Sequence, residues 1–422
     1  MRIATSEFYS TSLATMENQQ SQLLQIEQQV SSGVAISNPG DNPLGAAQAV
    51  HLSSTSATLT QYASNQSTAL TSLQIEGTAL TNITTTLQSI NSIASEALGG
   101  SLNDTNRAAL AKQMEGYRNE LLSYANANDG QGNMLFSGFQ KTSQVFTDTA
   151  GKGAQYNGDS GQRVIQVNDT RQIAIGDSGS SVFLSVQPLG SQQVPAGSAT
   201  NTGTGVIGAV TVTDPTAATN GDSYSIGFAN DPVTNALTYT VTDNSAVPPT
   251  TTAAKPYTDG AAISLGTGMN VTISGTPSGV VTPPAVVGDS FTVTPATAAA
   301  NTNVFTTIDN MIAALNQPSQ DNATATATYT NAMTTGMAAL SNSLSNVITI
   351  QASVGGREQE LQALQTVTSN NALQTTTDLQ TLMSTNMTAA ISQYTQVQNS
   401  LSASQKTFAQ TQQLSLFQYI NP

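Results

Sequence analysis

Two short stretches of the sequence have the composition of the nucleophile loop of a trypsin-like serine protease. Both read Gly-Asp-Ser-Gly, at residues 158–161 and 176–179. A nucleophilic serine of that kind needs a histidine base that a carboxylate orients. The chain has one histidine, His51, and its place in a long helical repeat is wrong for such a base. We therefore interpret both stretches as Asp-Gly turns between strands, and His51 as an exposed or half-buried helix residue.

The remaining residue types provide no other catalytic, cofactor-binding or metal-binding pattern. The chain has no cysteine, which excludes disulfides, thiolate zinc sites and cysteine nucleophiles. It has no phosphate-binding glycine loop, and one histidine cannot supply an HExxH zinc site. The aspartates of the middle region never fall at the spacing of a calcium loop. We expect no catalysis, no cofactor and no metal, which leaves a structural or binding role.

Composition limits the classes of partner. At 422 residues the chain can form two or three domains, but only 9% of its residues are charged and 5% are aromatic. With so few large apolar side chains, we expect part of its stability to come from assembly. A net charge of −14 argues against nucleic acid as a partner. No apolar run approaches the ~20 residues of a membrane span, and the start of the chain does not resemble a cleaved secretory signal.

The elements that organise the chain are heptad repeats, of which the longest covers residues 52–97. Alternating steps of three and four residues place one narrow, mostly apolar seam along a helix. At 1.5 Å per residue this helix is about 70 Å long, so it needs partner helices along its length. The seam consists of Leu52, Thr55, Leu59, Tyr62, Gln66, Ala69, Leu73, Glu76, Leu80, Ile83, Leu87, Ile90, Ala94 and Ala97.

Two further repeats supply the partners. After a helix end at Gly99-Gly100, Asn103 and Asp104 can cap a second helix, whose seam is Leu110, Met114, Tyr117, Leu121 and Tyr124. Another helix is expected from about Asn303, followed after Pro318 by a longer one. Its seam is Leu340, Leu344, Val347, Gln351, Val354, Glu358 and Leu361.

The two ends of the chain share a thinner stripe. The amino-terminal stripe, before the turn at 37–43, is Leu13, Met16, Leu23, Ile26 and Val30. The carboxy-terminal one is read as an unbroken heptad and includes Met383, Met387, Tyr394, Val397, Leu401 and Phe408. Because the surrounding residues are almost all polar, we expect these segments to be disordered alone and helical once docked. The alternative is a weakly folded helix that packs on its own domain.

Between the helical regions the period changes to that of strands. Short runs with β-branched or aromatic alternation are separated by Gly, Pro, Asn and Asp, which indicates an inserted all-β domain of sandwich or barrel type. The expected strands are 163–167, 171–175, 182–186, 206–212, 223–228, 237–242, 269–273 and 290–294.

With these residues in place, the chain resembles the flagellin superfamily of bacterial flagella and, within it, the hook–filament junction subfamily. Its opening and closing residues fit that subfamily better than filament flagellin. The departures, Leu44 and Gly356 where alanine is usual, leave the family unchanged. The resemblance rests on QVSSG at 29–33, NPGDNPLGAA at 38–47, GNMLFSG at 132–138, YNGDSGQR at 156–163, VF at 182–183, GDSFTVTP at 288–295, VGGR at 354–357 and LSLFQYI at 414–420.

The resemblance implies an α+β multidomain fold, with a long coiled-coil bundle built from both chain ends and an inserted β domain. The expected parts are a terminal coiled-coil domain (1–42 and 376–422), disordered when free, a helical rod (43–144 and 300–375) and an outer β domain (145–299). The eleven residues named for the two terminal stripes would form the subunit interface.

The resemblance also implies an extracellular structural subunit of the flagellum, exported without a cleaved signal. It would join the hook, through the first hook-associated protein, to the flagellin filament. Its partners would be copies of itself, that protein, flagellin and an export chaperone, with no nucleic acid and no membrane. The alternatives are a filament-forming flagellin and, from another class, a secreted hydrolase or an adhesin with a glycan-binding β insert.

Overall fold

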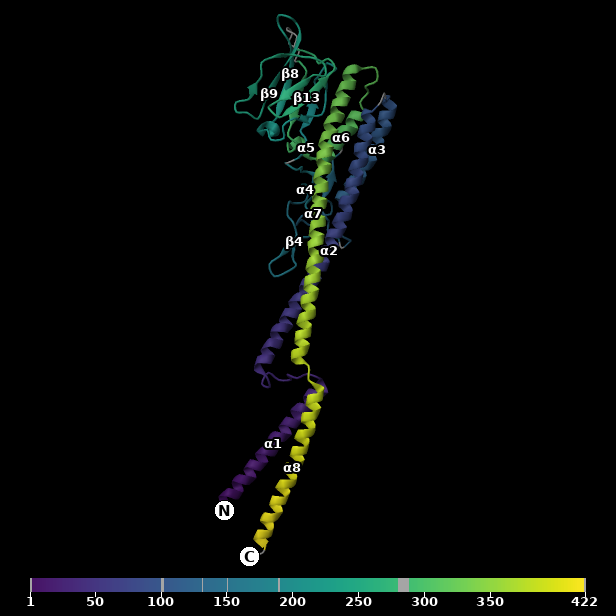
Figure 1. Cartoon of the computed structure of the whole chain (residues 1–422). Coiled ribbons are helices and arrows are strands. Elements are labelled where there is room, and N and C mark those ends of the chain that lie inside the picture. Colours follow the sequence, from purple (N-terminus) through teal and green to yellow (C-terminus); the bar gives the residue numbers. More distant parts are fainter. Residues whose placement is uncertain are drawn as a thin grey trace. The chain divides into compact units, whose positions relative to one another are not determined.

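The computed structural model describes residues 2–99, 102–130, 132–149, 151–188, 190–279 and 288–420, with side chains described from residue 7 to residue 412 within these ranges. Gly100, one half of the expected helix end, and the final Asn421 and Pro422 lie outside the described residues, as do the side chains of 414–420. The chain divides into two compact units. One consists of Ser67–Gln362, and the other of Met1–Gln66 together with Ala363–Pro422. Figure 1 shows the elements.

Long helices form one part of the Ser67–Gln362 unit, to which α2 (Pro43–Leu98) and α7 (Ala323–Met383) each contribute a segment. Every expected seam position from Ala69 to Ala97 is buried, as the heptad spacing predicts. The expected pairing with the 340–361 repeat is observed. Gln351 donates to Thr81 Oγ1 at 2.9 Å, and the Tyr329 hydroxyl donates to the Ala97 carbonyl at 2.7 Å.

Two shorter helices complete this helical part, and each begins at an asparagine cap. In α3 (Asp104–Ala125), Asn103 Oδ1 accepts from the Asn106 amide at 2.8 Å, as the sequence predicts. In α6 (Val304–Leu315), the Asn303 side chain accepts from two backbone amides of the first turn. α5 (Ala299–Thr302) is a single turn just before it.

A buried ion pair joins α3 to α6. Arg118 Nε lies 2.5 Å from Asp309 Oδ1, and both side chains are 6% exposed. Asp148 of β1 accepts a further bond from Arg118 Nη2 at 2.6 Å, and the Gly153 amide donates to Asp309 Oδ2 at 2.8 Å. The pair therefore also fixes the place where the chain leaves the helices.

All strands of the described residues lie between Phe146 and Thr294. A six-stranded sheet has the order β10-β9-β8-β14-β5, with β11 also on β9, and a four-stranded sheet has the order β12-β13-β6, with β7 on β13. Two antiparallel hairpins, β1-β2 and β3-β4, precede them. The strands are β1 (Phe146–Asp148), β2 (Ala154–Tyr156), β3 (Val164–Gln166), β4 (Gln172–Ala174), β5 (Val194–Gly197), β6 (Val206–Ile207), β7 (Thr211–Val212), β8 (Tyr224–Asn230), β9 (Leu237–Asp243), β10 (Thr250–Thr251), β11 (Lys255–Pro256), β12 (Ala262–Leu265), β13 (Met269–Ser274) and β14 (Ser290–Thr294).

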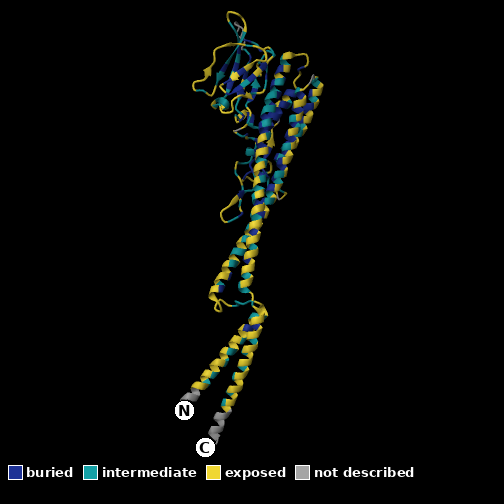
Figure 2. Cartoon of the chain, in the orientation of Figure 1, coloured by how far each residue is buried: buried dark blue, intermediate teal, exposed yellow. Residues whose placement is uncertain are grey.

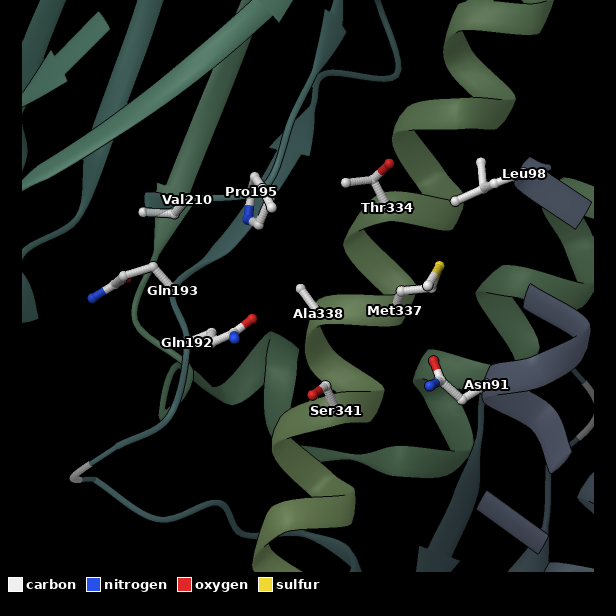
Figure 3. Close-up of a pocket in the computed structure, with 11 residues that line it drawn as sticks. Asn91, Leu98, Gln192, Gln193, Pro195, Val210, Thr334, Met337, Ala338 and Ser341 are labelled. Carbon is white, nitrogen blue, oxygen red and sulfur yellow. The ribbon is translucent and has the colours of Figure 1, made fainter. Parts of the chain in front are cut away.

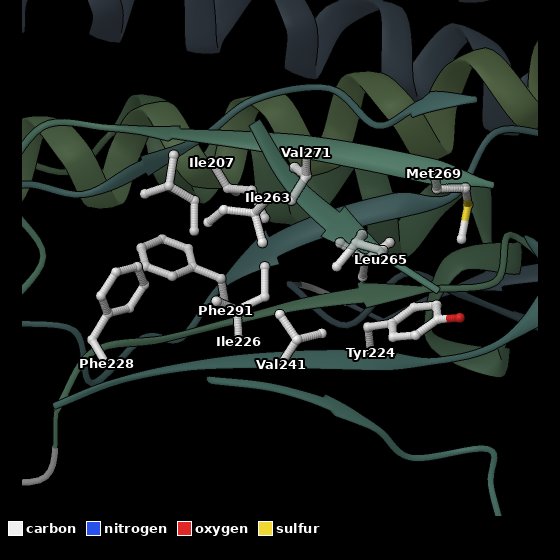
Figure 4. Packing of buried hydrophobic residues seen from close by; sticks show 12 residues of the cluster. Ile207, Tyr224, Ile226, Phe228, Val241, Ile263, Leu265, Met269, Val271 and Phe291 are labelled. Atoms are coloured by element: carbon white, nitrogen blue, oxygen red, sulfur yellow. The ribbon is translucent and has the colours of Figure 1, made fainter. Parts of the chain in front are cut away.

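The two larger sheets share one hydrophobic core, which makes this domain a sandwich (Figure 4). Phe291 and Ile226 come from the six-stranded sheet and Ile207 and Val271 from the other, and all four are at most 1% exposed. A short 3-10 helix, η1 (Ala218–Gly221), precedes β8. The expected all-β insertion is confirmed.

One expected strand is wrong. Residues 182–186 do not form a strand, because the first two belong to α4 (Gly179–Phe183) and the other three have no regular structure. Ser178 accepts from the Ser181 amide as the cap of α4. The second Gly-Asp-Ser-Gly stretch is thus a helix start and not a turn between strands, whereas the first does connect β2 to β3. The local serine bonds and the burial of Phe183 against Phe136, with ring centroids 5.5 Å apart, favour the helix.

Other strand boundaries also differ from the expectation. The run 206–212 divides into the short strands β6 and β7. Six strands were not expected from the sequence, namely β1, β2, β5, β10, β11 and β12. Most are short, and β5 and β11 contain proline, so their composition is not that of a strand.

The other unit contains α1 (Arg2–Ser32) and α8 (Met387–Ile420), with the end segments of α2 and α7. Gly33, with φ of +72°, follows α1 in the left-handed conformation that ends many helices. The carboxy-terminal stripe is not carried by one helix, since α7 ends at Met383 and α8 begins at Met387. Asn386 caps α8 by accepting from the Ala389 amide at 3.1 Å.

Candidate assembly surface

Helices α1 and α8 lie side by side through a thin seam (Figure 1). The rings of Tyr9 and Phe408 meet edge to face, with centroids 5.6 Å apart. Most seam residues remain only half-buried, and Ile26 and Ala390 alone among the described ones fall below 9% exposed. Figure 2 shows that both helices remain largely exposed. Such a pair gains little from its own contacts, because a half-buried side chain contributes only part of its transfer free energy.

The phase of α1 differs from the expected stripe at one residue. Leu13 is 51% exposed and does not face α8, whereas the less exposed Ser12 and Gln19 lie in the seam. The heptad that starts at Tyr9 explains this difference, because its next position is the polar Ser12 and not the neighbouring Leu13. The observed seam is Tyr9, Ser12, Met16, Gln19, Leu23, Ile26 and Val30.

The phase of α8 agrees with the expectation over most of its length. Tyr394, Val397, Leu401 and Phe408 are all half-buried, in steps of three, four and seven residues. Met387, at the first residue of α8, is 43% exposed and does not lie in the seam.

Met383 has a different place, because it is the last residue of α7. Its carbonyl accepts from the Ala35 amide at 2.6 Å, in a short antiparallel bridge between Val34 and Ser384. The Thr385 amide donates to the Gly33 carbonyl at 3.0 Å. Met383 therefore contributes backbone that ties together the two segments next to α1 and α8.

Large apolar side chains outside the seam point to solvent. On α1, Phe8 is 47% exposed and Leu24 59%, and on α8 Ile391 is 53% exposed. Sequence reasoning missed these three residues because they do not fit the heptad. The sequence held no distinguishing signal for them, because single apolar residues are common on protein surfaces.

A groove lies between α1 and α8 at the level of Phe8 and Phe408, with a volume of about 320 Å³. Its other lining residues are small, including Ser12, Ala403 and Ser404. Small side chains of this kind leave room for the close approach of another helix.

Charge is distributed unequally between the two helices. The α1 sequence contains three acids, Glu7, Glu17 and Glu27, and one cation, Arg2, whereas α8 contains Lys406 and no acid. Contacts of α1 with α1 are therefore less favourable electrostatically than contacts of α1 with α8. A head-to-tail contact of that kind builds rings or helical layers rather than closed pairs.

The Ser67–Gln362 unit contains a larger groove, of about 340 Å³, between α7 and the segments around β5 and β6 (Figure 3). Its lining includes Met337, Leu98 and Pro195, with the amides Gln192 and Asn91, and contains no ionisable side chain. Within the described ranges, no three His, Asp or Glu side chains lie together as a metal site would require. No helix there has the length and apolar character to cross a membrane.

The chain resembles known proteins throughout its length. The family model for the bacterial flagellin N-terminal helical region matches residues 3–141. Flagellar hook-associated protein 3 of Escherichia coli K12 is 27% identical over 418 residues, which cover 99% of both chains. FlgL of Xanthomonas campestris is 27% identical with a TM-score of 0.64, covering 77% of this chain and 98% of that one. The flagellar junction protein FlgL of Legionella pneumophila is 25% identical with a TM-score of 0.65, covering 80% and 99%.

The paired terminal helices, the helical repeats and the β insertion define a flagellin-like structural subunit. The chain is similar to the flagellin superfamily in its amino-terminal region and, over 99% of its length, to flagellar hook-associated protein 3.

Proposed function

We propose that this chain is the structural subunit that joins the flagellar hook, through the first hook-associated protein, to the flagellin filament. The observation that carries the proposal is the α1/α8 pair, whose seam is only half-buried and whose outer faces expose Phe8, Leu24 and Ile391. A pair with these properties has unused apolar surface for neighbours. The full-length similarity to hook-associated protein 3 supports the position at the junction.

The proposed interface comprises the terminal stripes in their observed phase. The residues expected from sequence were Leu13, Met16, Leu23, Ile26, Val30, Met383, Met387, Tyr394, Val397, Leu401 and Phe408. In this proposal Leu13 and Met387 contact neighbouring subunits directly, since both are exposed, and the half-buried residues hold α1 to α8. Met383 positions residues 384–386, which connect α7 to α8.

Assembly completes the terminal domain in this proposal. Segments 1–42 and 376–422 are loosely held in the free subunit and become fixed when neighbours cover them, which defers the ordering cost to assembly. Segments 43–144 and 300–375 form the rod, and 145–299 the outer β domain. A chain that orders late can travel unfolded through an export channel, bound to a chaperone, without a cleaved signal.

We infer no enzymatic activity, because the relatives are flagellar structural proteins and Ser178, one of the two serines in the Gly-Asp-Ser-Gly stretches, caps a helix. Neither a filament-forming flagellin nor a glycan-binding adhesin has a specific observation in its favour.

Gold labelling tests the proposed position. The natural chain has no cysteine, so Val233→Cys, at a site 89% exposed in the loop between β8 and β9, provides a single thiol. Isolated flagella that carry this variant are treated with a maleimide gold particle and imaged. We expect one labelled band between hook and filament, with the unsubstituted chain as control. Label along the whole filament would overturn the junction assignment and favour a flagellin.

A further inference from the structure

A buried carboxylate occupies the seam of α2 at a position that a coiled coil normally fills with an apolar residue. Glu76 is 1% exposed. Its Oε1 accepts from the Asp177 amide at 2.8 Å, and its Oε2, also buried, has no hydrogen-bond partner. An ionised carboxylate with an unsatisfied oxygen is costly in such a place.

The surrounding charges do not fully compensate Glu76. Arg357 of α7 pairs with the Asp177 carboxylate and also donates to the Ala174 carbonyl at 3.1 Å. Gln162 donates to Asp177 Oδ1 at 2.6 Å. Arg357 therefore pairs directly with Asp177 and not with Glu76, which leaves two carboxylates beside one paired guanidinium.

Two other charged side chains lie near this site. Glu358 of α7 lies beside Gly77 of α2, with its Oε1 3.5 Å from the position that a Cβ on this glycine would take. Arg163 acts on Glu76 from the segment before β3 and favours its ionised form. Burial and the nearby Asp177 outweigh the cations and raise the pKa of Glu76 to about 7.

We propose that Glu76, Asp177 and Arg357 form a proton-dependent clasp, which holds residues 174–183 against α2 and α7 more tightly when Glu76 is protonated. With Glu76 protonated the three side chains are neutral together, and with it ionised they carry one uncompensated negative charge. The held segment runs from β4 through α4, and the Phe183 ring lies 5.1 Å from Phe146 of β1 and 5.7 Å from Phe305 of α6, measured between centroids. The clasp therefore couples the packing of this segment against β1 and α6 to pH.

The direction of the pH dependence follows from the linkage between closure of the clasp and protonation of Glu76. The closed state binds the Glu76 proton more strongly than the open state, so closure is most favourable at low pH. It weakens as pH rises from the ordinary value of 4.5 to about 7, and then levels off. The opening equilibrium constant should rise up to tenfold per pH unit in this window, about 300-fold in total.

Hydrogen exchange of the backbone amides in 174–183 measures this equilibrium. We expect protection, corrected for intrinsic exchange rates, to fall between pH 5 and pH 7 in the natural chain. Glu76→Gln should make it independent of pH. Glu96→Gln, at an exposed site on the same helix, should behave as the natural chain. A flat profile in the natural chain, or the same slope in Glu76→Gln, would overturn the proposal.

A second measurement uses only the natural protein, so it tests the proposal even if the Glu76→Gln variant misfolds. Carbon-13 titration of the glutamate carboxyl resonances in the natural protein should show one glutamate with a midpoint near pH 7. If every glutamate titrates below about pH 5, no proton-dependent clasp exists.

Discussion

Leu401→Asp should separate the stability of the subunit from its assembly. Leu401 lies half-buried in the α1/α8 seam, in a different compact unit from Ser67–Gln362. Removal of a half-buried leucine costs about 1 kcal/mol within the α1/α8 pair. Distant, independent sites contribute additively within about 0.5 kcal/mol, so the melting of the Ser67–Gln362 unit should not change.

Assembly should respond much more strongly. Once neighbours cover the seam, the new carboxylate is a buried charge without a partner, which costs about 3–5 kcal/mol. That cost corresponds to a loss of more than 100-fold in incorporation. Ser402→Asp is the matched control, because it adds the same charge to the adjacent, exposed position.

The assay is a competition. Equal amounts of natural and variant chain are expressed together, isolated flagella are digested, and the two peptides are quantified by mass spectrometry. Circular dichroism melting of each purified chain checks the fold. We expect Ser402→Asp in the flagella and Leu401→Asp almost absent. Equal incorporation of the two variants would refute a buried role for this seam.

Three substitutions test the Ser67–Gln362 unit by urea unfolding. Asp309→Ala leaves Arg118 with the partly exposed Asp148 as its only carboxylate among the described residues, and should cost about 3–5 kcal/mol; a loss below 1 kcal/mol would contradict the role of this pair. Asn103→Ala removes the cap of α3 and should cost about 1 kcal/mol, whereas the exposed Thr105→Ala should change little. Gly153→Ala should cost about 1–3 kcal/mol, because φ is +82° and a Cβ would meet Thr306; an unchanged midpoint would argue against this packing.

Hydropathy patterning was sufficient to predict the rod helices. From Ala69 to Ala97 every heptad position is buried, including Glu76, because the spacing and not the residue type determines which side faces the partner. Capping chemistry was equally local, so Asn103 could be identified as a cap, and apolar spacing placed another helix start near Asn303.

Prediction failed where local pattern competes with long-range packing. The segment 182–186 has the composition of a strand, but Ser178 and the aromatic cluster around Phe183 favour a helix. In α1 the apolar residues are too sparse to fix the phase, so Leu13 was assigned to the seam in place of Ser12. The sequence could not show that Leu24 and Ile391 are exposed, since the exposure of a side chain depends on which partner helix covers it.

The buried clasp was also outside the reach of sequence reasoning. Glu76 was identified as a seam residue, but its partners Asp177 and Arg357 are about 100 and 280 positions away along the chain. Only the folded arrangement brings these three charges together.

The central claim is that α1 and α8 gain most of their stability from neighbouring subunits. Limited digestion of the purified monomer with subtilisin, followed by mass spectrometry, tests it most directly. We predict rapid loss of about 40 residues from each end, which leaves a resistant fragment near residues 45–375. Termini that survive as long as the 67–97 segment of α2 would contradict the claim, because the pair would then be stable without an assembly.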